Sequence, residues 1–284
     1  MNEPQYKMNI VIQGGLYPST IKTAHHYAEL DLVEKVVIST WENEAVEQED
    51  IKSQKLVLVK NKKPDYAGPG NLNLHLLSSR EGVARCENGV ILKIRSDEIL
   101  SHEGLITWFD YFKKHDNGNT LNYLDGEKQL SKIAVIAMNI TYPYHPQDHV
   151  FIGYKKDLTK LFNMPFSNEK EFGPEPVDFT KNLRNNIYIG ANYFSLFFEE
   201  PAKHFENWRS YLVDNSEHRG DSMDFYLNNL DSIFFPLPVV DMGWEKFHTQ
   251  YWWEGYGQYG DIYADKGYGD YQNIYAENNY GKKT

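Results

Sequence analysis

The sequence predicts an α/β fold, a Rossmann-type mixed sheet flanked by helices, because short apolar strands alternate with helices along most of the chain. Runs rich in β-branched residues recur at 8–13, 35–40, 55–59 and 90–94. Apolar residues at helical spacing fill the gaps between them. At 284 residues the chain is long enough for one large domain. We expect that domain at 1–250 and a Tyr- and Gly-rich C-terminal extension at 251–284.

Composition excludes several classes of protein. The net charge of -11 comes without a long basic run, which argues against nucleic acid as a partner. The single cysteine, Cys86, rules out an intramolecular disulfide framework and a Cys-rich zinc site, and it fits a reducing compartment. No apolar segment is long enough for a transmembrane span, and the first apolar run is too short for a signal peptide. The sequence therefore predicts a soluble, cytoplasmic protein.

The first strand, 8–13, ends at Gly14-Gly15. Two glycines allow the backbone to approach a ligand closely. The turn lacks the GxGxxG pattern, which argues against a dinucleotide-dependent dehydrogenase.

The next elements lead to the centre of the sheet. We expect a helix at 19–30, a strand at 35–40 that ends in Thr40-Trp41-Glu42, a charged helix at 43–52 and a strand at 55–59. The segment 61–70 contains two Pro and two Gly and is predicted to be a loop. A helix at 71–86 follows, with Asn71 or Asn73 suited to its start.

The central strand begins at Val90 as a β-branched, apolar run. Such a strand belongs in the middle of a parallel sheet, and a ligand crevice is expected at its C-terminal edge. The residues delivered to that edge are Arg95, Ser96, Asp97 and Glu98.

Asp97 is the expected ligand of Mn²⁺ or Mg²⁺, since a carboxylate at a strand end can hold a cation whose shell is completed by substrate phosphates. Lys93 and Arg95 occupy alternate strand positions and project to one face, where they can meet a diphosphate. The alternative is an ion pair at the strand end, with Asp97 capping the next helix. Further ligand candidates, each more often structural in proteins, are His145, His149, His218 and His248.

The second half of the chain continues the alternation. A helix beginning at Ser101 carries an apolar stripe assigned to the core: Leu105, Trp108, Phe109 and Phe112. A strand is expected at 132–139, an irregular loop around Pro143 and Pro146, and then a short strand and a helix. The remaining expectations are a strand-to-helix unit at 187–213, a helix at 220–230 and a Pro-rich segment at 234–242 that lies on a sheet edge or over the surface.

The C-terminal extension contains a twelve-residue repeat. YGQYGDIYAD from Tyr256 recurs as YGDYQNIYAE from Tyr268. Two copies are too few for a solenoid. Together with Trp252 and Trp253, these aromatic residues can stack on sugar rings of an acceptor or mediate self-association into a homodimer.

Four motifs in order give the chain a family resemblance: the Gly14-Gly15 turn, STWE at 39–42, Asn71-x-Asn73 and KIRSD at 93–97. With them the chain resembles the WavE family of lipopolysaccharide-synthesis proteins, and the resemblance continues through 148–162. It implies a GT-A-like glycosyltransferase fold, in which an Asp-x-Asp motif binds the diphosphate of a nucleotide-sugar through a metal. Here Arg95 replaces the first Asp, which leaves open whether Arg95 takes over part of the metal's work.

The function expected from residues and resemblance is glycosyl transfer from a nucleotide-sugar to a surface glycan: lipopolysaccharide, capsule or a glycoprotein glycan. A lipid-linked acceptor would bring the protein to the membrane surface. One alternative is a nucleotidyltransferase that makes an activated sugar, although QGGLYPST has no basic residue before Lys22. The other is a non-catalytic glycan-binding protein on a transferase scaffold.

The predicted nucleotide contacts share one edge of the sheet, because they end strands or start helices there. They are Gln13, Gly14, Thr40, Trp41 and Asn71, with Lys93 and Arg95 nearer the phosphates. If the reaction inverts the anomeric configuration, a carboxylate must deprotonate the acceptor hydroxyl. Asp148 is the predicted base, and Glu175 and Asp221 are its rivals.

Overall fold

The computed structural model describes residues 7–17, 19–116, 120–136, 138–139, 143–168, 183–201, 216–237, 244–246 and 261–262. Within them a seven-stranded mixed sheet has the order β3-β2-β1-β4-β8-β6-β9. In that order its strands are β3 (Leu56–Asn61), β2 (Val33–Trp41), β1 (Met8–Gln13), β4 (Val90–Arg95), β8 (Phe151–Tyr154), β6 (Ile133–Val135) and β9 (Phe234–Pro236). The predicted α/β class and mixed sheet are confirmed.

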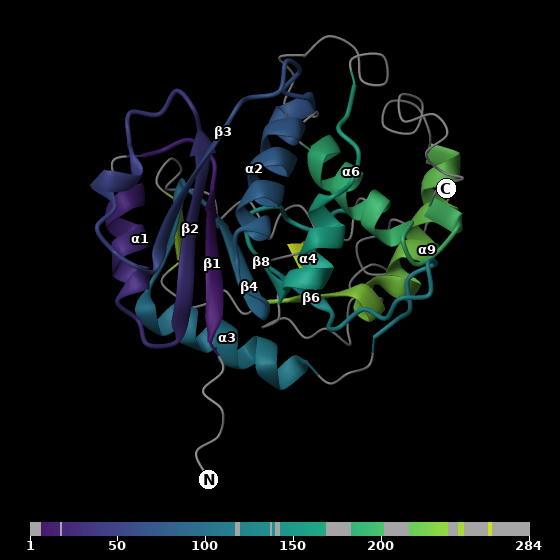
Figure 1. The fold of residues 1–284 in the computed structure, drawn as a ribbon. Coiled ribbons are helices and arrows are strands. Elements are labelled where there is room, and N and C mark those ends of the chain that lie inside the picture. The colour runs from purple at the N-terminus through teal and green to yellow at the C-terminus, as the bar shows by residue number, and fades with distance from the viewer. Residues whose placement is uncertain are drawn as a thin grey trace.

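Helices cover both faces of this sheet (Figure 1). They are α1 (Thr20–Ala28), α2 (Leu72–Ala84), α3 (His102–His115), α4 (Lys155–Phe162), α6 (Leu183–Phe194) and α9 (Ser216–Ile233). One hydrophobic core joins α1 and α3 to the sheet, and another joins α2, α4, α6 and α9 to the opposite face. The stripe predicted on α3 lies in the first core, and Ser101 caps that helix by accepting a hydrogen bond from the Gly104 amide.

The parallel part of the sheet creates a crevice between β1 and β4. Strand β1 pairs in parallel with β2 on one side and with β4 on the other. The connection through α1 leads to β2, and the connection through α2 leads into β4. Connections that diverge from neighbouring parallel strands leave an opening at the C-terminal edge of the sheet. The fold therefore places β1, β2 and β4 around a ligand-sized opening.

Two short ladders lie outside the main sheet. Strand β5 (Glu98–Leu100) pairs with β10 (Trp244–Lys246), and β7 (Met138–Asn139) pairs with β11 (Asp261–Ile262), both antiparallel. Thus β5, which follows Asp97 directly, is backed by a strand from far along the chain. The prediction of a single strand at 132–139 is wrong, because these residues divide between β6 and β7, which belong to different sheets.

The prediction of a charged helix at 43–52 is wrong. Only a short 3-10 turn, η1 (Gln48–Asp50), forms there. The side chains of the segment bond instead to backbone far from their own turn: the Glu44 carboxylate accepts from the Leu16 amide at 3.2 Å, and the Gln48 amide oxygen accepts from the Leu58 amide at 2.8 Å. Tertiary contacts of this kind outweigh a weak local preference for helix.

The strand expected at the start of 187–213 is also wrong, because those residues belong to helix α6. Ile187, Ala191 and Phe194 are all buried, a spacing that gives a helix an apolar face although two β-branched residues stand near its middle. The helix predicted at 220–230 is confirmed as part of α9. The Pro-rich strand β9 lies at the sheet edge, as predicted.

Several sequence predictions fall on residues that the structure does not describe. Glu175, His248, Trp252 and Trp253 lie outside the described residues, as does the repeat apart from Asp261–Ile262. His218 and Asp221 lie on α9. The domain boundary at residue 250 stays a prediction. Within the described part of the chain, no helix is long and apolar enough to cross a membrane.

Candidate functional site

A pocket of about 230 Å³ lies at the C-terminal ends of β1, β2 and β4, beside the start of α2. Its walls mix glycine backbone, two aromatic rings, amides and charged groups. The lining residues are Gln13, Gly14, Gly15, Tyr17, Trp41, Gly70, Asn71, Leu74, His75, Arg95, Ser96, Asp97 and Asp148. This is the sheet edge that the sequence predicts for a ligand.

The floor of the pocket forms where the ends of β1 and β4 meet. The Ser96 amide donates to the Gln13 carbonyl at 2.9 Å, and the Gly14 amide donates to the Ser39 carbonyl at 3.1 Å. Gly14 has a φ of +127°, and a Cβ there would lie 2.7 Å from the Ser96 Oγ. Only glycine meets both conditions without strain. The close approach of the two strands therefore depends on Gly14.

A strained turn at the start of α2 forms the opposite rim. Gly70 and Asn71 both have positive φ, 53° and 66°. The amides of Asn71, Leu72 and Asn73 donate to carbonyls of the preceding loop. Because these amides are already bonded, the helix start contributes fewer free donors for an anion than an open helix N-terminus does. Positive charge for a phosphate must come from side chains.

Arg95 and Asp97 form a bidentate pair on the pocket wall. The Arg95 Nε donates to Asp97 Oδ1 and Nη2 donates to Oδ2, both at 2.8 Å. Burial alone would lower the pKa of Arg95, but Asp148, Asp97 and Glu98 raise it above its ordinary value. Arg95 is thus a permanent cation in the pocket.

The predicted metal ligand Asp97 has both carboxylate oxygens bonded to this guanidinium. The described residues contain no group of three or more His, Cys, Asp or Glu side chains arranged around a metal position. A cation at Asp97 would therefore need Arg95 to release the carboxylate, and phosphate oxygens and water to complete its shell.

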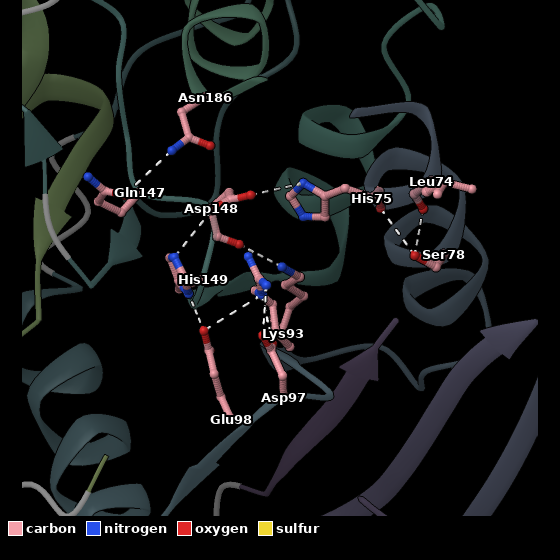
Figure 2. Close-up of polar contacts among 11 residues, drawn as sticks. Leu74, His75, Ser78, Lys93, Asp97, Glu98, Gln147, Asp148, His149 and Asn186 are labelled. Atoms are coloured by element: carbon pink, nitrogen blue, oxygen red, sulfur yellow. Dashed lines mark hydrogen bonds and ion pairs between the residues drawn. The ribbon is translucent and has the colours of Figure 1, made fainter. Parts of the chain in front are cut away.

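Asp148 also lines the pocket and lies between two imidazoles (Figure 2). Its Oδ2 is 3.7 Å from His75 Nδ1 and its Oδ1 is 3.7 Å from His149 Nε2. Burial alone would raise the pKa of Asp148, yet the surrounding basic side chains hold it well below its ordinary value. The carboxylate is therefore ionised, and part of its hydrogen-bonding capacity remains open to a ligand.

A second layer of buried polar groups supports these side chains. Lys93, fully buried, donates from Nζ to the Asp148 carbonyl at 2.7 Å. Burial lowers the pKa of Lys93 to about 8, although Asp148 and Glu98 oppose the shift. Glu98 contacts the His149 Nδ1 (Figure 2) and lies 3.8 Å from the Arg95 Nε, so one carboxylate connects these two basic side chains.

The structure brings most of the predicted site residues together. Those that line the pocket are Gln13, Gly14, Trp41, Asn71, Arg95, Asp97 and Asp148. Thr40 and Lys93 are fully buried and do not line it. Trp41, which follows Thr40, does line it, because successive strand residues face opposite sides of a sheet. Lys93 is buried behind the wall, where it donates to the Asp148 carbonyl.

Sequence reasoning missed several lining residues, above all Tyr17, Leu74 and His75. For His75 a signal existed. It lies three residues after Leu72 and directly before Leu76, on the side of α2 that carries the apolar stripe. A histidine within an apolar stripe is a polar group that must be buried, and its partners are then worth seeking.

The chain belongs to the WavE lipopolysaccharide synthesis family, whose model matches residues 30–232. This match contains β2 to β8, most of α9 and most of the pocket. No curated protein matches the chain.

Solved structures show distant similarity. The chain is similar to S. aureus TarS 1-349 (13% identity, TM-score 0.39, 67% of this chain and 56% of that chain). It is similar to 4-diphosphocytidyl-2C-methyl-D-erythritol synthase from Anaerococcus prevotii DSM 20548 (10% identity, TM-score 0.37, 68% and 100%). The UTP-bound UGPase from Acinetobacter baumannii is a third (9% identity, TM-score 0.34, 71% and 99%). At these identities and scores the similarities carry no weight for function.

Proposed function

We propose that this protein is a glycosyltransferase that moves a sugar from a nucleotide-sugar to a surface glycan acceptor. The observation that supports this most is that one pocket, at the C-terminal ends of β1, β2 and β4, is lined by both Arg95 and the ionised Asp148. Sugar transfer needs a cation beside the leaving diphosphate and a carboxylate beside the acceptor hydroxyl. The lipopolysaccharide synthesis family supplies the acceptor class.

The nucleoside is assigned to the β1 and β2 side of the pocket. Gln13 is 8% exposed, and its amide oxygen has no hydrogen-bond partner among the described residues. An amide can pair with the edge of a base, and the Trp41 ring beside it offers a flat surface for a base or ribose. The glycine backbone at Gly14 and Gly15 allows the nucleotide to approach β1 closely.

The diphosphate is assigned to the Arg95 wall. The lining charges there are one arginine against two aspartates, so the pocket itself has no excess positive charge. Lys93 behind the wall only restores balance. A bound Mn²⁺ or Mg²⁺ would offset the phosphate charge and polarise the leaving group. Asp97 is the residue proposed to hold it, once Arg95 turns from Asp97 to a phosphate oxygen.

Asp148 is the proposed base. In an inverting transfer it would accept the proton of the acceptor hydroxyl while the bond from the anomeric carbon to the diphosphate breaks and that carbon bonds to the acceptor oxygen. It lines the pocket from the segment before β8 and not from the strand that carries Arg95, which suits this role. The glycan acceptor, a lipid-linked form of it at the membrane surface, and self-association through the C-terminal extension remain proposals.

A thermal-shift screen tests the proposal. UDP-, GDP-, CMP- and dTDP-sugars are added with Mn²⁺ or with EDTA, and at least one is expected to raise the melting temperature, more strongly with the metal. Asp97→Asn should lose the metal-dependent part of the shift. Asp110→Asn removes an exposed carboxylate of α3 and is the control. The absence of any shift would refute nucleotide-sugar binding, and a shift unchanged in EDTA would refute the metal.

A second measurement separates the alternatives. Release of free nucleotide from the stabilising sugar donor is expected of a transferase in the absence of its acceptor, at a slow rate. A glycan-binding protein would release none. A nucleotidyltransferase would instead form nucleotide-sugar from sugar phosphate and nucleoside triphosphate.

A further inference from the structure

The imidazole of His75 is a buried ring in the wall of the pocket without hydrogen bonds to the described residues. It is only 7% exposed, and neither ring nitrogen has a hydrogen-bond partner among the described residues. A neutral imidazole carries one donor and one acceptor, and buried polar groups are nearly always paired. Because the ring lines the pocket, a ligand there can supply the missing partner.

The surroundings of His75 contain charges of both signs. Asp148 Oδ2 lies 3.7 Å from its Nδ1, a gap slightly too long for a hydrogen bond and too short to hold a water between the atoms. Lys93 and Arg95 of β4 and His149 of the loop before β8 are the cationic or basic groups that act on it. From α4 the Phe162 ring packs against it edge-on, with the centroids 5.9 Å apart.

These neighbours keep the imidazole neutral in the ligand-free protein. Burial lowers the pKa of His75 well below its ordinary value, Lys93 and Arg95 lower it further, and Asp148 opposes them. An anion that neutralises Arg95 and Lys93 would remove the repulsion and leave the attraction of Asp148. The charge on His75 is therefore coupled to the occupancy of the pocket by an anion.

We propose that His75 takes up a proton when the diphosphate of a nucleotide-sugar binds, and that the resulting imidazolium bridges Asp148 and a phosphate oxygen. Nδ1–H then donates to Asp148 Oδ2, and Nε2–H donates to the phosphate, so that both unpaired nitrogens gain partners in one step. The proton adds a positive charge to a pocket whose lining residues have none in excess. This inference rests on the proposed function, because it needs the diphosphate.

The test measures protons directly by titration calorimetry on the full chain with MgCl₂. UDP-glucose, GDP-mannose and dTDP-glucose are titrated at pH 6.5 in buffers of different ionisation enthalpy. Their diphosphate diesters do not titrate near neutral pH, so uptake by the protein appears in the slope of binding enthalpy against buffer ionisation enthalpy. An uptake of roughly half a proton or more per bound molecule is expected, with affinity falling as pH rises.

Variants assign the proton to its residue. His75→Gln keeps a side-chain donor but cannot take up a proton, so uptake should vanish while binding persists. Asp148→Asn should reduce the uptake, because the imidazolium loses its partner. His149 is the other imidazole beside Asp148, but it does not line the pocket. The variant His149→Gln should therefore still take up the proton on ligand binding, even where the substitution lowers the melting temperature. The measurement on the unchanged protein stands even if a variant fails to fold.

The outcomes separate this inference from the proposed function. Binding without proton uptake, or uptake that persists in His75→Gln, would overturn the inference and leave the transferase intact. Binding confined to CMP-sugars, which have no diphosphate, would do the same. If no nucleotide-sugar of any class stabilises the protein, the proposed function and the inference both fail.

Discussion

Two buried aspartates, Asp157 and Asp148, show opposite ways to accommodate a carboxylate. The Asp157 carboxylate accepts hydrogen bonds from the Tyr123 hydroxyl at 2.8 Å and from the amides of Leu130 and Ser131 at 3.1 Å. The Asp148 carboxylate accepts none from the described residues and has two imidazole nitrogens at 3.7 Å. The first carboxylate fixes a loop to α4, whereas the second keeps its lone pairs available within a pocket.

The two environments also shift the pKa in opposite directions. Burial raises the pKa of Asp157, and its hydrogen bonds only partly oppose this. Around Asp148 the basic side chains outweigh the effect of burial and lower the pKa. A carboxylate surrounded by neutral donors is typical of a structural role, and one surrounded by cations in a pocket is typical of a site. Measuring both the free energy of unfolding and the transfer activity of variants therefore tells the two types of carboxylate apart.

The largest expected effect is on stability, from Asp157→Ala. The change leaves three donors without their acceptor, and we expect the free energy of unfolding to fall by about 4 kcal/mol. Urea denaturation followed by circular dichroism measures it. Asp125→Ala, which removes an exposed carboxylate paired with Lys160, is the control and should cost under about 1 kcal/mol. Equal losses in the two variants would contradict a structural role for Asp157.

Asp148→Asn should reverse that pattern. Transfer is expected to fall roughly a hundredfold, the size typical of losing a general base, while stability falls by only about 1–2 kcal/mol. The pKa of Asp148 is lowered by folding, so its contribution to stability is present above the ordinary aspartate pKa and is lost as the pH falls through the lower, folded value. Steady-state transfer and urea denaturation at two pH values measure both effects. Near-normal transfer with a large loss of stability would make Asp148 a structural residue like Asp157.

The smallest effect concerns Lys93 and depends on pH. Its pKa is about 8 in the folded protein and 10.5 is its ordinary value in an unfolded chain, so between these values the unfolded chain binds more protons. Stability should therefore rise with pH across this window, and Lys93→Met should remove about 2 kcal/mol of that rise. Lys113→Met, on the exposed surface of α3, serves as the control. The same rise in Lys93→Met as in the unchanged protein would show that Lys93 is not the group responsible.

Much of the sheet and of the pocket edge could be predicted from the sequence. The strands at 8–13, 35–40, 55–59 and 90–94 have β-branched runs bounded by turn residues, and their order places Gly14, Trp41 and Asp97 at one edge. The rule that ligands bind at the C-terminal ends of parallel strands then brings these residues together without knowledge of any contact.

The errors arose where tertiary contacts outweigh local pattern. At 43–52, bonds from Glu44 and Gln48 to backbone far from their own turn replaced a helix, and no local pattern reveals such partners. For Asp97 the sequence left two alternatives open, a metal ligand or an ion pair at the strand end, and the direct bonds to Arg95 show that the ion pair forms. His75 was missed because 71–86 was predicted only as a helix, and the polar residues within it were not considered as candidates for the site.

The ladder between β5 and β10 affects the order in which the site can be completed during synthesis. All residues that line the pocket lie between Gln13 and Asp148, so the ribosome releases them before the strand that supports them. Strand β5, immediately after Asp97, has to wait for Trp244–Lys246 before its antiparallel ladder can form. A nascent chain can therefore assemble the parallel strands early, as domains generally do from their N-terminal part, and still lack a supported Arg95–Asp97 wall. The strand that supports this wall of the proposed ligand site is therefore supplied by the last sixth of the chain. None of the residues that line the pocket lies in that part.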